Sequence, residues 1–156
     1  MKKILYICLI IPIFVYANPS PFGLKIGQVT PEETKMKYHT LYKVYDDKYP
    51  QLDTYAIEPT EFTIHGMKQA TLAYKSNKLV YILTRFNKDK FNYFFDLLSK
   101  KYTVVFKETP NGGDKFVSFS DGETLIWIIS INSDADMGLN YMDKKTFREI
   151  MTFKGS

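Results

Sequence analysis

The chain has 156 residues, of which 45% are hydrophobic and 24% charged, so it can build one folded domain and is not disordered by composition. Its formal net charge is only +4, and Arg85 and Arg148 are the only arginines, which argues against a nucleic-acid surface. The single cysteine, Cys8, excludes a disulfide framework and a cysteine-ligated zinc site.

Residues 1–17 have the pattern of an export signal. Lysines follow Met1, an apolar stretch runs from Ile4 to Tyr16, and Ala17 offers a small residue for cleavage. The stretch is shorter than the roughly 20 residues that a membrane-spanning helix needs. We therefore expect cleavage after Ala17, a single domain over residues 18–156, a periplasmic or secreted location and no stable membrane span. An uncleaved anchor is the alternative.

The mature chain begins with a short extended segment and a helix. Phe22–Gly27 alternates weakly, which predicts a short strand or an extended stretch. Thr30, Pro31 and Glu33 form a capping box that starts a helix at Pro31. The sequence does not determine where this helix ends. A strand over Leu41–Tyr45 competes with one helical face that would contain Tyr38, Tyr42, Tyr45 and Tyr49.

A hairpin and a second helix follow. The predicted strands are Leu52–Ile57, Ala70–Tyr74 and Leu79–Phe86, and the turn-rich Lys75–Lys78 joins the last two as a hairpin. The second helix covers Lys88–Lys101. Its apolar stripe should face a sheet and consists of Phe91, Phe94, Phe95 and Leu98.

The remaining chain returns to strands before a last short helix. The predicted strands are Thr103–Phe106, Phe116–Phe119 and Thr124–Ile131. Asp121-Gly122 marks a hairpin turn between the last two. The apolar run Leu125–Ile129 predicts a central strand that is covered on both faces. Asp143 should cap a helix over Lys144–Met151.

These elements predict an α+β fold, in which two main helices pack on one face of an antiparallel sheet. The segment 71–82 is similar to the segment 116–128, and both are predicted hairpins. This likeness suggests a tandem helix-plus-hairpin repeat with subrepeats at 22–86 and 87–142. The alternative is that two unrelated hairpins share a short pattern.

The stretch Phe22–Glu33 reads Phe-Gly-x-x-x-Gly-x-x-Thr-x-Glu-Glu and resembles the opening of a loose group of small exported bacterial proteins. Tyr55–Pro59 is also similar to that group. The predicted architecture resembles the BamE outer-membrane assembly lipoproteins and the secreted β-lactamase inhibitor proteins, although the chain lacks the lipid-bearing cysteine of the first and the disulfides of the second. The resemblance implies an exported α+β module and no particular activity.

Catalytic signatures are missing from the sequence. Neither His39 nor His65 has another ligand at metal-binding spacing, and there is no Gly-x-Ser-x-Gly elbow or phosphate-binding loop. We therefore expect a protein that is not an enzyme and needs no cofactor. One alternative is a small hydrolase that uses His65 with Glu58 or Glu61.

A weak calcium-binding pattern lies near the C-terminus. Asn132, Asp134, Asp136 and Asp143 place oxygen ligands at positions that resemble a calcium loop. However, Gly138 falls one place late, and the twelfth residue is Asp instead of the longer Glu. These two departures favour a solvated acidic loop over a metal site.

The early tyrosines suggest a surface for another protein. Tyrosine is amphipathic and enriched at interfaces, so we expect Tyr42, Tyr45 and Tyr49, with Asp46 and Asp47, to rim a partner-binding surface. The alternative is that this face packs against the sheet.

The expected function follows from the compartment and the missing catalytic signatures. It is that of an exported, non-enzymatic module that binds a protein of the bacterial envelope, as an inhibitor or immunity protein against an envelope-acting enzyme or toxin. An envelope-assembly or outer-membrane accessory role is a further alternative.

Overall fold

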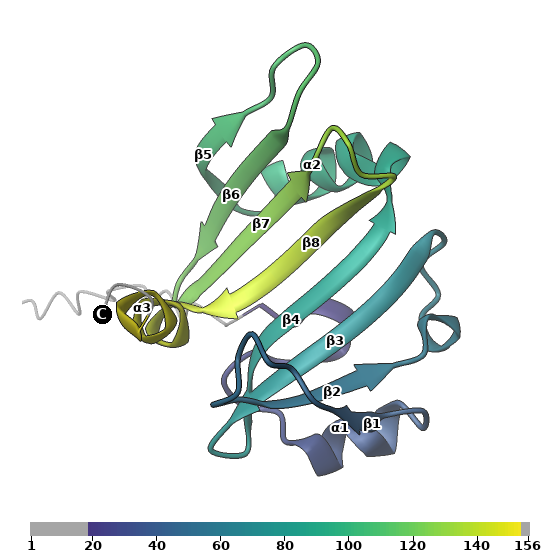
Figure 1. Ribbon diagram of the computed structural model, residues 1–156, viewed down its shortest axis with the longest axis vertical. Coiled ribbons are helices and arrows are strands. Elements are labelled where there is room, and N and C mark those ends of the chain that lie inside the picture. The colour runs from purple at the N-terminus through teal and green to yellow at the C-terminus, as the bar shows by residue number, and fades with distance from the viewer. Residues whose placement is uncertain (1–18, 154–156) are drawn as a thin grey trace, which may run out of the picture.

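One antiparallel sheet of eight strands organises residues 19–153, which are the residues that the computed structural model describes (Figure 1). Its strand order is β1-β2-β3-β4-β8-β7-β6-β5, and every neighbouring pair is antiparallel, as predicted. The predicted signal peptide, residues 1–17, lies outside the described residues. The strands are β1 (Tyr42–Val44), β2 (Asp53–Ile57), β3 (Met67–Lys75), β4 (Lys78–Asn87), β5 (Thr103–Glu108), β6 (Lys115–Asp121), β7 (Thr124–Ser130) and β8 (Asp136–Asp143).

The helices are short, so the predicted α+β class with two main helices is wrong and the fold is mostly β. The described α-helices are α1 (Pro31–Lys37), α2 (Phe91–Ser99) and α3 (Lys144–Phe153), and single 3₁₀ turns occur at η1 (Pro21–Gly23), η2 (Pro59–Glu61) and η3 (Lys88–Lys90). The predicted capping box at Thr30 is present. Nevertheless α1 ends at Lys37, because the chain beyond it turns back to pair with β2 as strand β1.

Strand β8 also explains why the predicted fold class is wrong. It adds a strand to the sheet at residues that the sequence predicted as a loop. Met137, Leu139 and Tyr141 alternate into the core, which is a strand period of two. Gly138 and Asn140 point to the other face and hide this pattern, since neither residue is typical of strands.

Two meanders of four strands form the sheet, and each follows a helix. Strands β1–β4 come after α1, and β5–β8 come after α2. The meanders join where β4 pairs with β8, from Tyr81 opposite Met142 to Asn87 opposite Asp136. The two similar hairpins of the sequence correspond to β3–β4 and β6–β7, so they hold different positions within their meanders.

The predicted hairpin at Lys75–Lys78 is present and has a two-residue turn. Ser76 and Asn77 have φ values of 49° and 61°, and Lys75 pairs directly with Lys78. Positive φ at both central residues is the requirement of a type I′ turn, whose twist matches that of the flanking strands. This turn therefore sets the register of β3 and β4, two of the longest strands in the sheet.

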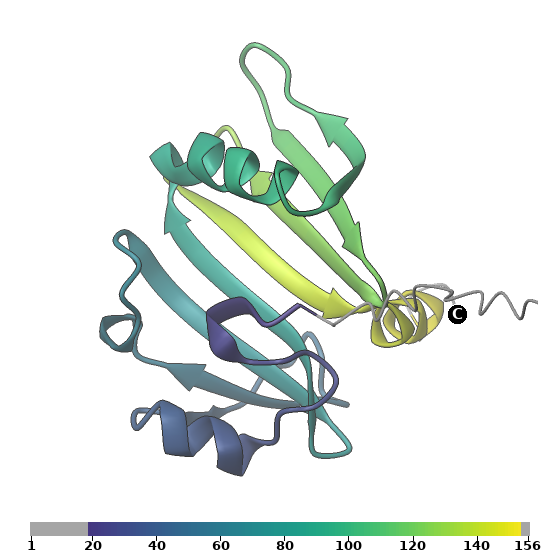
Figure 2. The same ribbon diagram turned by 180° about the vertical axis from the view of Figure 1, so that it is seen from behind.

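The helices α1 and α2 and the N-terminal segment 19–30 lie on one face of the sheet (Figure 2). Helix α2 buries Phe91, Phe94 and Leu98 against the sheet, as its stripe predicted. Helix α1 is tied to β3 by a buried hydrogen bond of 2.7 Å between the hydroxyls of Thr34 and Tyr74. This covered face holds the main hydrophobic core.

The opposite face has only a partial cover. Segment 45–52 and helix α3 close one end of it over a smaller cluster that contains Leu52, Ala73, Val80, Tyr81, Met142 and Ile150. The rest of this face carries no second layer (Figure 1). None of the helices in the described part of the chain is long and apolar enough to cross a membrane.

Candidate protein-binding surface

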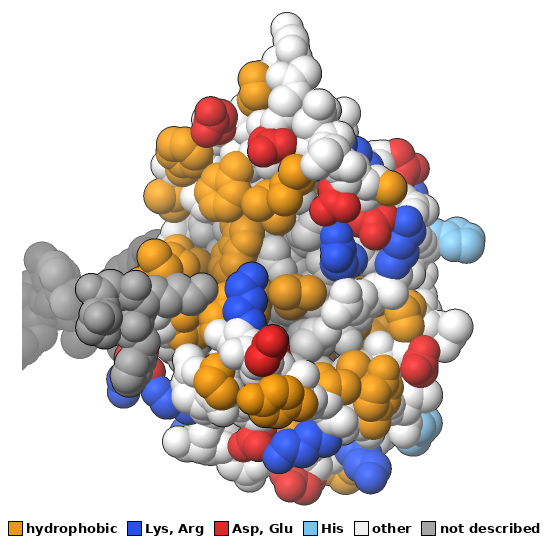
Figure 3. Space-filling model, viewed as in Figure 1, with side chains coloured by type: hydrophobic (Ala, Val, Ile, Leu, Met, Phe, Trp, Pro, Cys, Tyr) orange, Lys and Arg blue, Asp and Glu red, His pale blue; other side chains and the backbone are white. Residues whose placement is uncertain are grey.

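The uncovered face is the part of the sheet that lies opposite α1 and α2 and is not covered by α3. Strand register places one row of its side chains side by side across six strands. Figure 3 shows hydrophobic side chains gathered on this side of the molecule, with acidic and basic side chains beside them. The row consists of Thr71, Leu83, Asn140, Trp127, Ser118 and Phe106.

Aromatic rings pack against one another at the boundary between the covered end and the open part of this face. Trp127 stacks on Tyr81 with ring centroids 5.9 Å apart, and Tyr49 meets the edge of Tyr81 at 6.1 Å. Burial raises the pKa of the Tyr81 hydroxyl, and nearby Tyr49 and Asp46 add to this shift. Tyr49, one of the predicted partner-binding residues, therefore packs within the protein.

A hollow of about 320 Å³ opens in the uncovered face at Gly138 of β8, where the sheet carries no side chain. A Cβ atom at Gly138 would lie 3.1 Å from Cγ2 of Ile129 and 3.2 Å from Nδ2 of Asn140, so even a methyl group would crowd this floor. Asn140 is only 4% exposed, and its Oδ1 accepts no hydrogen bond from the described residues. Asn140 therefore carries an unsatisfied acceptor buried beneath the floor of the hollow.

A second hollow, of about 520 Å³, lies over β1, β2 and β3 on the same face. Four predicted partner-binding residues line it together: Tyr42, Tyr45, Asp46 and Asp47. Tyr45 is 85% exposed and Tyr42 is 49% exposed. Glu58 also lines this hollow, and neither it nor the two aspartates form an ion pair within residues 19–153. The structure therefore brings the predicted set together, except for Tyr49.

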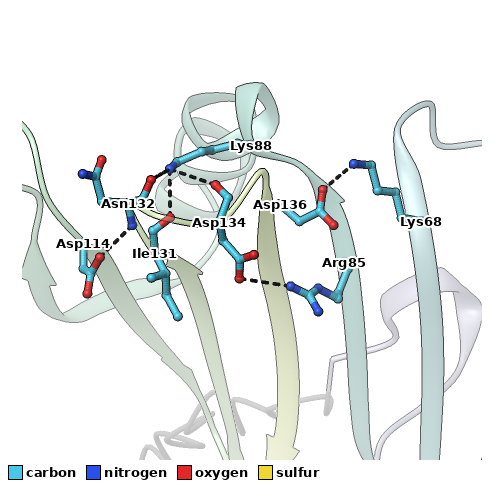
Figure 4. Close-up of polar contacts among 8 residues, drawn as sticks. All are labelled: Lys68, Arg85, Lys88, Asp114, Ile131, Asn132, Asp134 and Asp136. Carbon is cyan, nitrogen blue, oxygen red and sulfur yellow. Dashed lines mark hydrogen bonds and ion pairs between the residues drawn. The ribbon is translucent and has the colours of Figure 1, made fainter.

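The polar cluster of Figure 4 borders the first hollow. Arg85 of β4 pairs with Asp134 at 3.1 Å, and Lys68 of β3 pairs with Asp136. The Lys88 ammonium donates hydrogen bonds to the backbone carbonyls of Ile131, Asn132 and Asp134 at 2.8, 2.9 and 3.1 Å, respectively. A lysine cation thus occupies the centre of the turn between β7 and β8.

The four calcium candidates do not converge. Asn132, Asp134 and Asp136 lie near the start of β8, whereas Asp143 lies at its far end. There Asp143 accepts the backbone N–H of Thr146 at 2.8 Å and caps α3, as the helix prediction expected. Within residues 19–153, no group of three or more His, Cys, Asp or Glu side chains is arranged to hold a metal ion.

Replacing Lys88 by methionine is expected to loosen the turn between β7 and β8. The substitution keeps the apolar stem and removes three charge-assisted hydrogen bonds, which should lower the free energy of unfolding by about 1–2 kcal/mol. Hydrogen exchange should accelerate at residues 131–135. Lys90→Met in the same 3₁₀ turn is the control, and unchanged exchange in the Lys88 variant would contradict this role.

The hydrolase candidates are not joined into a catalytic pair. Glu61 accepts the backbone N–H groups of His39 at 3.0 Å and Thr40 at 2.6 Å. Desolvation raises the pKa of Glu61, but the hydrogen bonds from Thr40 and His39 outweigh it and lower the pKa below its ordinary value. His65 is exposed, and within residues 19–153 no hydrogen bond or ion pair links it to Glu58 or Glu61.

Sequence reasoning missed Trp127, Asn140 and Gly138 as residues of the uncovered face. The apolar run on β7 predicted cover on both faces, but only Ile126 and Ile128 are fully buried, and Trp127 is half-buried. A signal for β8 was present in the alternation of Met137, Leu139 and Tyr141.

No protein-family model matches the chain, and no curated protein or solved structure is significantly similar to it. The resemblance of Phe22–Glu33 to small exported bacterial proteins therefore stays a prediction.

Proposed function

We propose that the chain is an exported, non-enzymatic module of the bacterial envelope that binds another protein through its uncovered face. Within this class we favour an inhibitor or immunity protein that acts by contact on an envelope enzyme or toxin. Export rests on the signal pattern of residues 1–17. The observation that carries the binding role is a sheet face of mixed apolar and polar side chains with two hollows, most of which has no second layer over it.

The chemistry of this face favours a protruding loop of a partner protein. Interfaces combine aromatic and apolar groups with polar and charged ones. Here the ion pairs of Arg85 and Lys68 lie between the tyrosine–acid hollow over β1–β3 and the apolar side chains of Trp127 and Ile129 on β7. The acidic hollow suits a basic residue.

Affinity capture with the tagged protein from envelope extract, followed by titration of the purified partner, tests this proposal. Replacing Tyr45 by alanine and both Asp46 and Asp47 by asparagine should weaken binding by about 2 kcal/mol or more, because these three side chains line the acidic hollow. Folding should be unaffected. Binding should also shift the fluorescence of Trp127, the only tryptophan in the sequence.

The matched control is Tyr93→Ala, because Tyr93 is an exposed tyrosine of α2 on the other side of the sheet. It should leave the affinity unchanged. The proposal would be contradicted by a partner that binds the triple variant and wild type equally, by capture of no stoichiometric partner, or by turnover that is lost in His65→Ala.

A further inference from the structure

A separate cavity of about 530 Å³ opens on the covered face, and Pro21 and Phe22 of the N-terminal segment line it together with residues of α2. Helix α2 contributes one wall and the segment 61–64 another, and β8 forms the floor. This volume falls within the range of small-molecule sites in proteins. The cavity lies on the opposite side of the sheet from the proposed partner surface.

The walls of the cavity are apolar and rich in rings. Phe22 packs edge to face against Phe62 at 5.4 Å and against Tyr141 at 6.5 Å. Leu97 of α2 lines the same space and is 51% exposed. The remaining apolar lining residues are Ile64, Phe94 and Leu139.

The backbone is strained where it presents Phe22 to the cavity. Phe22 has φ 57° and ψ 20°, a left-handed conformation that is costly for a bulky side chain. Its carbonyl accepts hydrogen bonds from the Lys37 ammonium at 2.8 Å and the Tyr38 hydroxyl at 2.7 Å, which hold it in place. Helix α1 therefore fixes the rim of the cavity.

A tyrosine of β8 lines the floor of this cavity. Tyr141 is only 6% exposed, and its ring meets the edge of Phe22. Burial raises the pKa of the Tyr141 hydroxyl, and the nearby Tyr102 adds to the shift, so the group stays protonated at neutral pH and can donate. A hydroxyl at the wall of a cavity can donate a hydrogen bond to an acceptor that a ligand supplies.

A lysine cation lies at the rim of the cavity. Lys37 forms no ion pair within residues 19–153, and its ammonium has donors left beyond the one that binds the Phe22 carbonyl. Glu61 also lines the rim, but its carboxylate already accepts the two backbone N–H groups of His39 and Thr40. The rim therefore offers a binding group for an anion.

We propose that this cavity binds a single-chain carboxylic acid that carries a second oxygen on its apolar body, an ω-hydroxy fatty acid being the simplest member of the class. The carboxylate pairs with Lys37 at the rim. The chain lies between Phe94, Leu97 and Leu139. The distal hydroxyl accepts a hydrogen bond from Tyr141.

Calorimetric titration of the purified protein with ω-hydroxydecanoate and with decanoate tests the site. Both acids should bind with one-to-one stoichiometry, and the hydroxy acid should bind more tightly. Lys37→Met should weaken both acids by about tenfold, whereas Tyr141→Phe should weaken only the hydroxy acid, by about fivefold. Removing a single hydroxyl oxygen leaves the packing of the Tyr141 ring intact, so this variant is expected to fold.

Lys35→Met, on the same helix but outside the cavity, is the matched control and should leave both affinities unchanged. Three outcomes would overturn the site: no binding of either acid, equal losses in the Lys35 and Lys37 variants, or an unchanged preference for the hydroxy acid in Tyr141→Phe. Binding to vesicles of anionic phospholipid without binding of the free acids would overturn it in favour of a membrane surface. None of these results bears on the partner surface, which is assayed separately.

Discussion

Replacing Phe86 by alanine is expected to lower the free energy of unfolding by about 3–5 kcal/mol, the largest effect among single substitutions considered for this fold. Phe86 of β4 is fully buried, and its ring lies 4.6 Å from that of Phe94 on α2. It also pairs across the strands with Met67 and Met137. Alanine would leave a cavity where α2, β3, β4 and β8 meet.

Urea denaturation followed by circular dichroism measures this loss. Phe106→Ala is the matched control, because Phe106 has the same side chain but is 52% exposed on the edge strand β5. The control should change stability by less than about 1 kcal/mol. Equal destabilisation by both variants would mean that α2 and β4 do not share one core.

Replacing Tyr81 by alanine is the second large expected effect, with a loss of about 3 kcal/mol. The Tyr81 ring is stacked on Trp127 and also touches Tyr49, so its removal takes away two aromatic contacts at once. The emission of Trp127 should shift to longer wavelength, because water reaches an indole that Tyr81 now covers. Equilibrium unfolding and fluorescence spectra together measure both consequences.

Tyr81→Phe separates the ring from the hydroxyl. It keeps the stacking on Trp127 and should retain wild-type emission, with a change in stability within about 1 kcal/mol. If Tyr81→Ala left the spectrum of Trp127 unchanged, the stacked arrangement would be wrong. The Trp127 signal would then lose its value as a reporter of the uncovered face.

Local signals predicted local structure well in this chain. The capping box at Thr30, the hairpin at Lys75–Lys78, the buried stripe of α2 and the cap of α3 at Asp143 all depend on residues a few positions apart. Each is present in the structure. Such features need no knowledge of which strands become neighbours.

The sheet order and the fold class could not be predicted from such signals. The pairing of β4 with β8 brings together segments that are far apart in the sequence, and no local pattern specifies it. The end of α1 could not be predicted either. The conformation of the chain after Lys37 is determined by its pairing with β2 and not by helix propensity.

The candidate surface was predicted only at its tyrosine rim. Spacing alone favoured Tyr42, Tyr45 and Tyr49 on one face, but the structure separates Tyr49 from the others because its ring packs on Tyr81. The floor around Trp127 and Gly138 was not foreseen. A residue without a side chain gives no sequence signal for a hollow until its cross-strand neighbours are known.

The late pairing of β4 with β8 has a consequence for how a nascent chain matures. A polypeptide that emerges from its amino end completes the first meander while β4, the longest strand, still has one row of unpaired backbone groups. That row stays open until the last strand arrives, so intermolecular strand addition competes during the interval. Chains truncated before residue 136 keep this edge permanently and are expected to aggregate, and a holdase that masks it would raise the yield of folded protein.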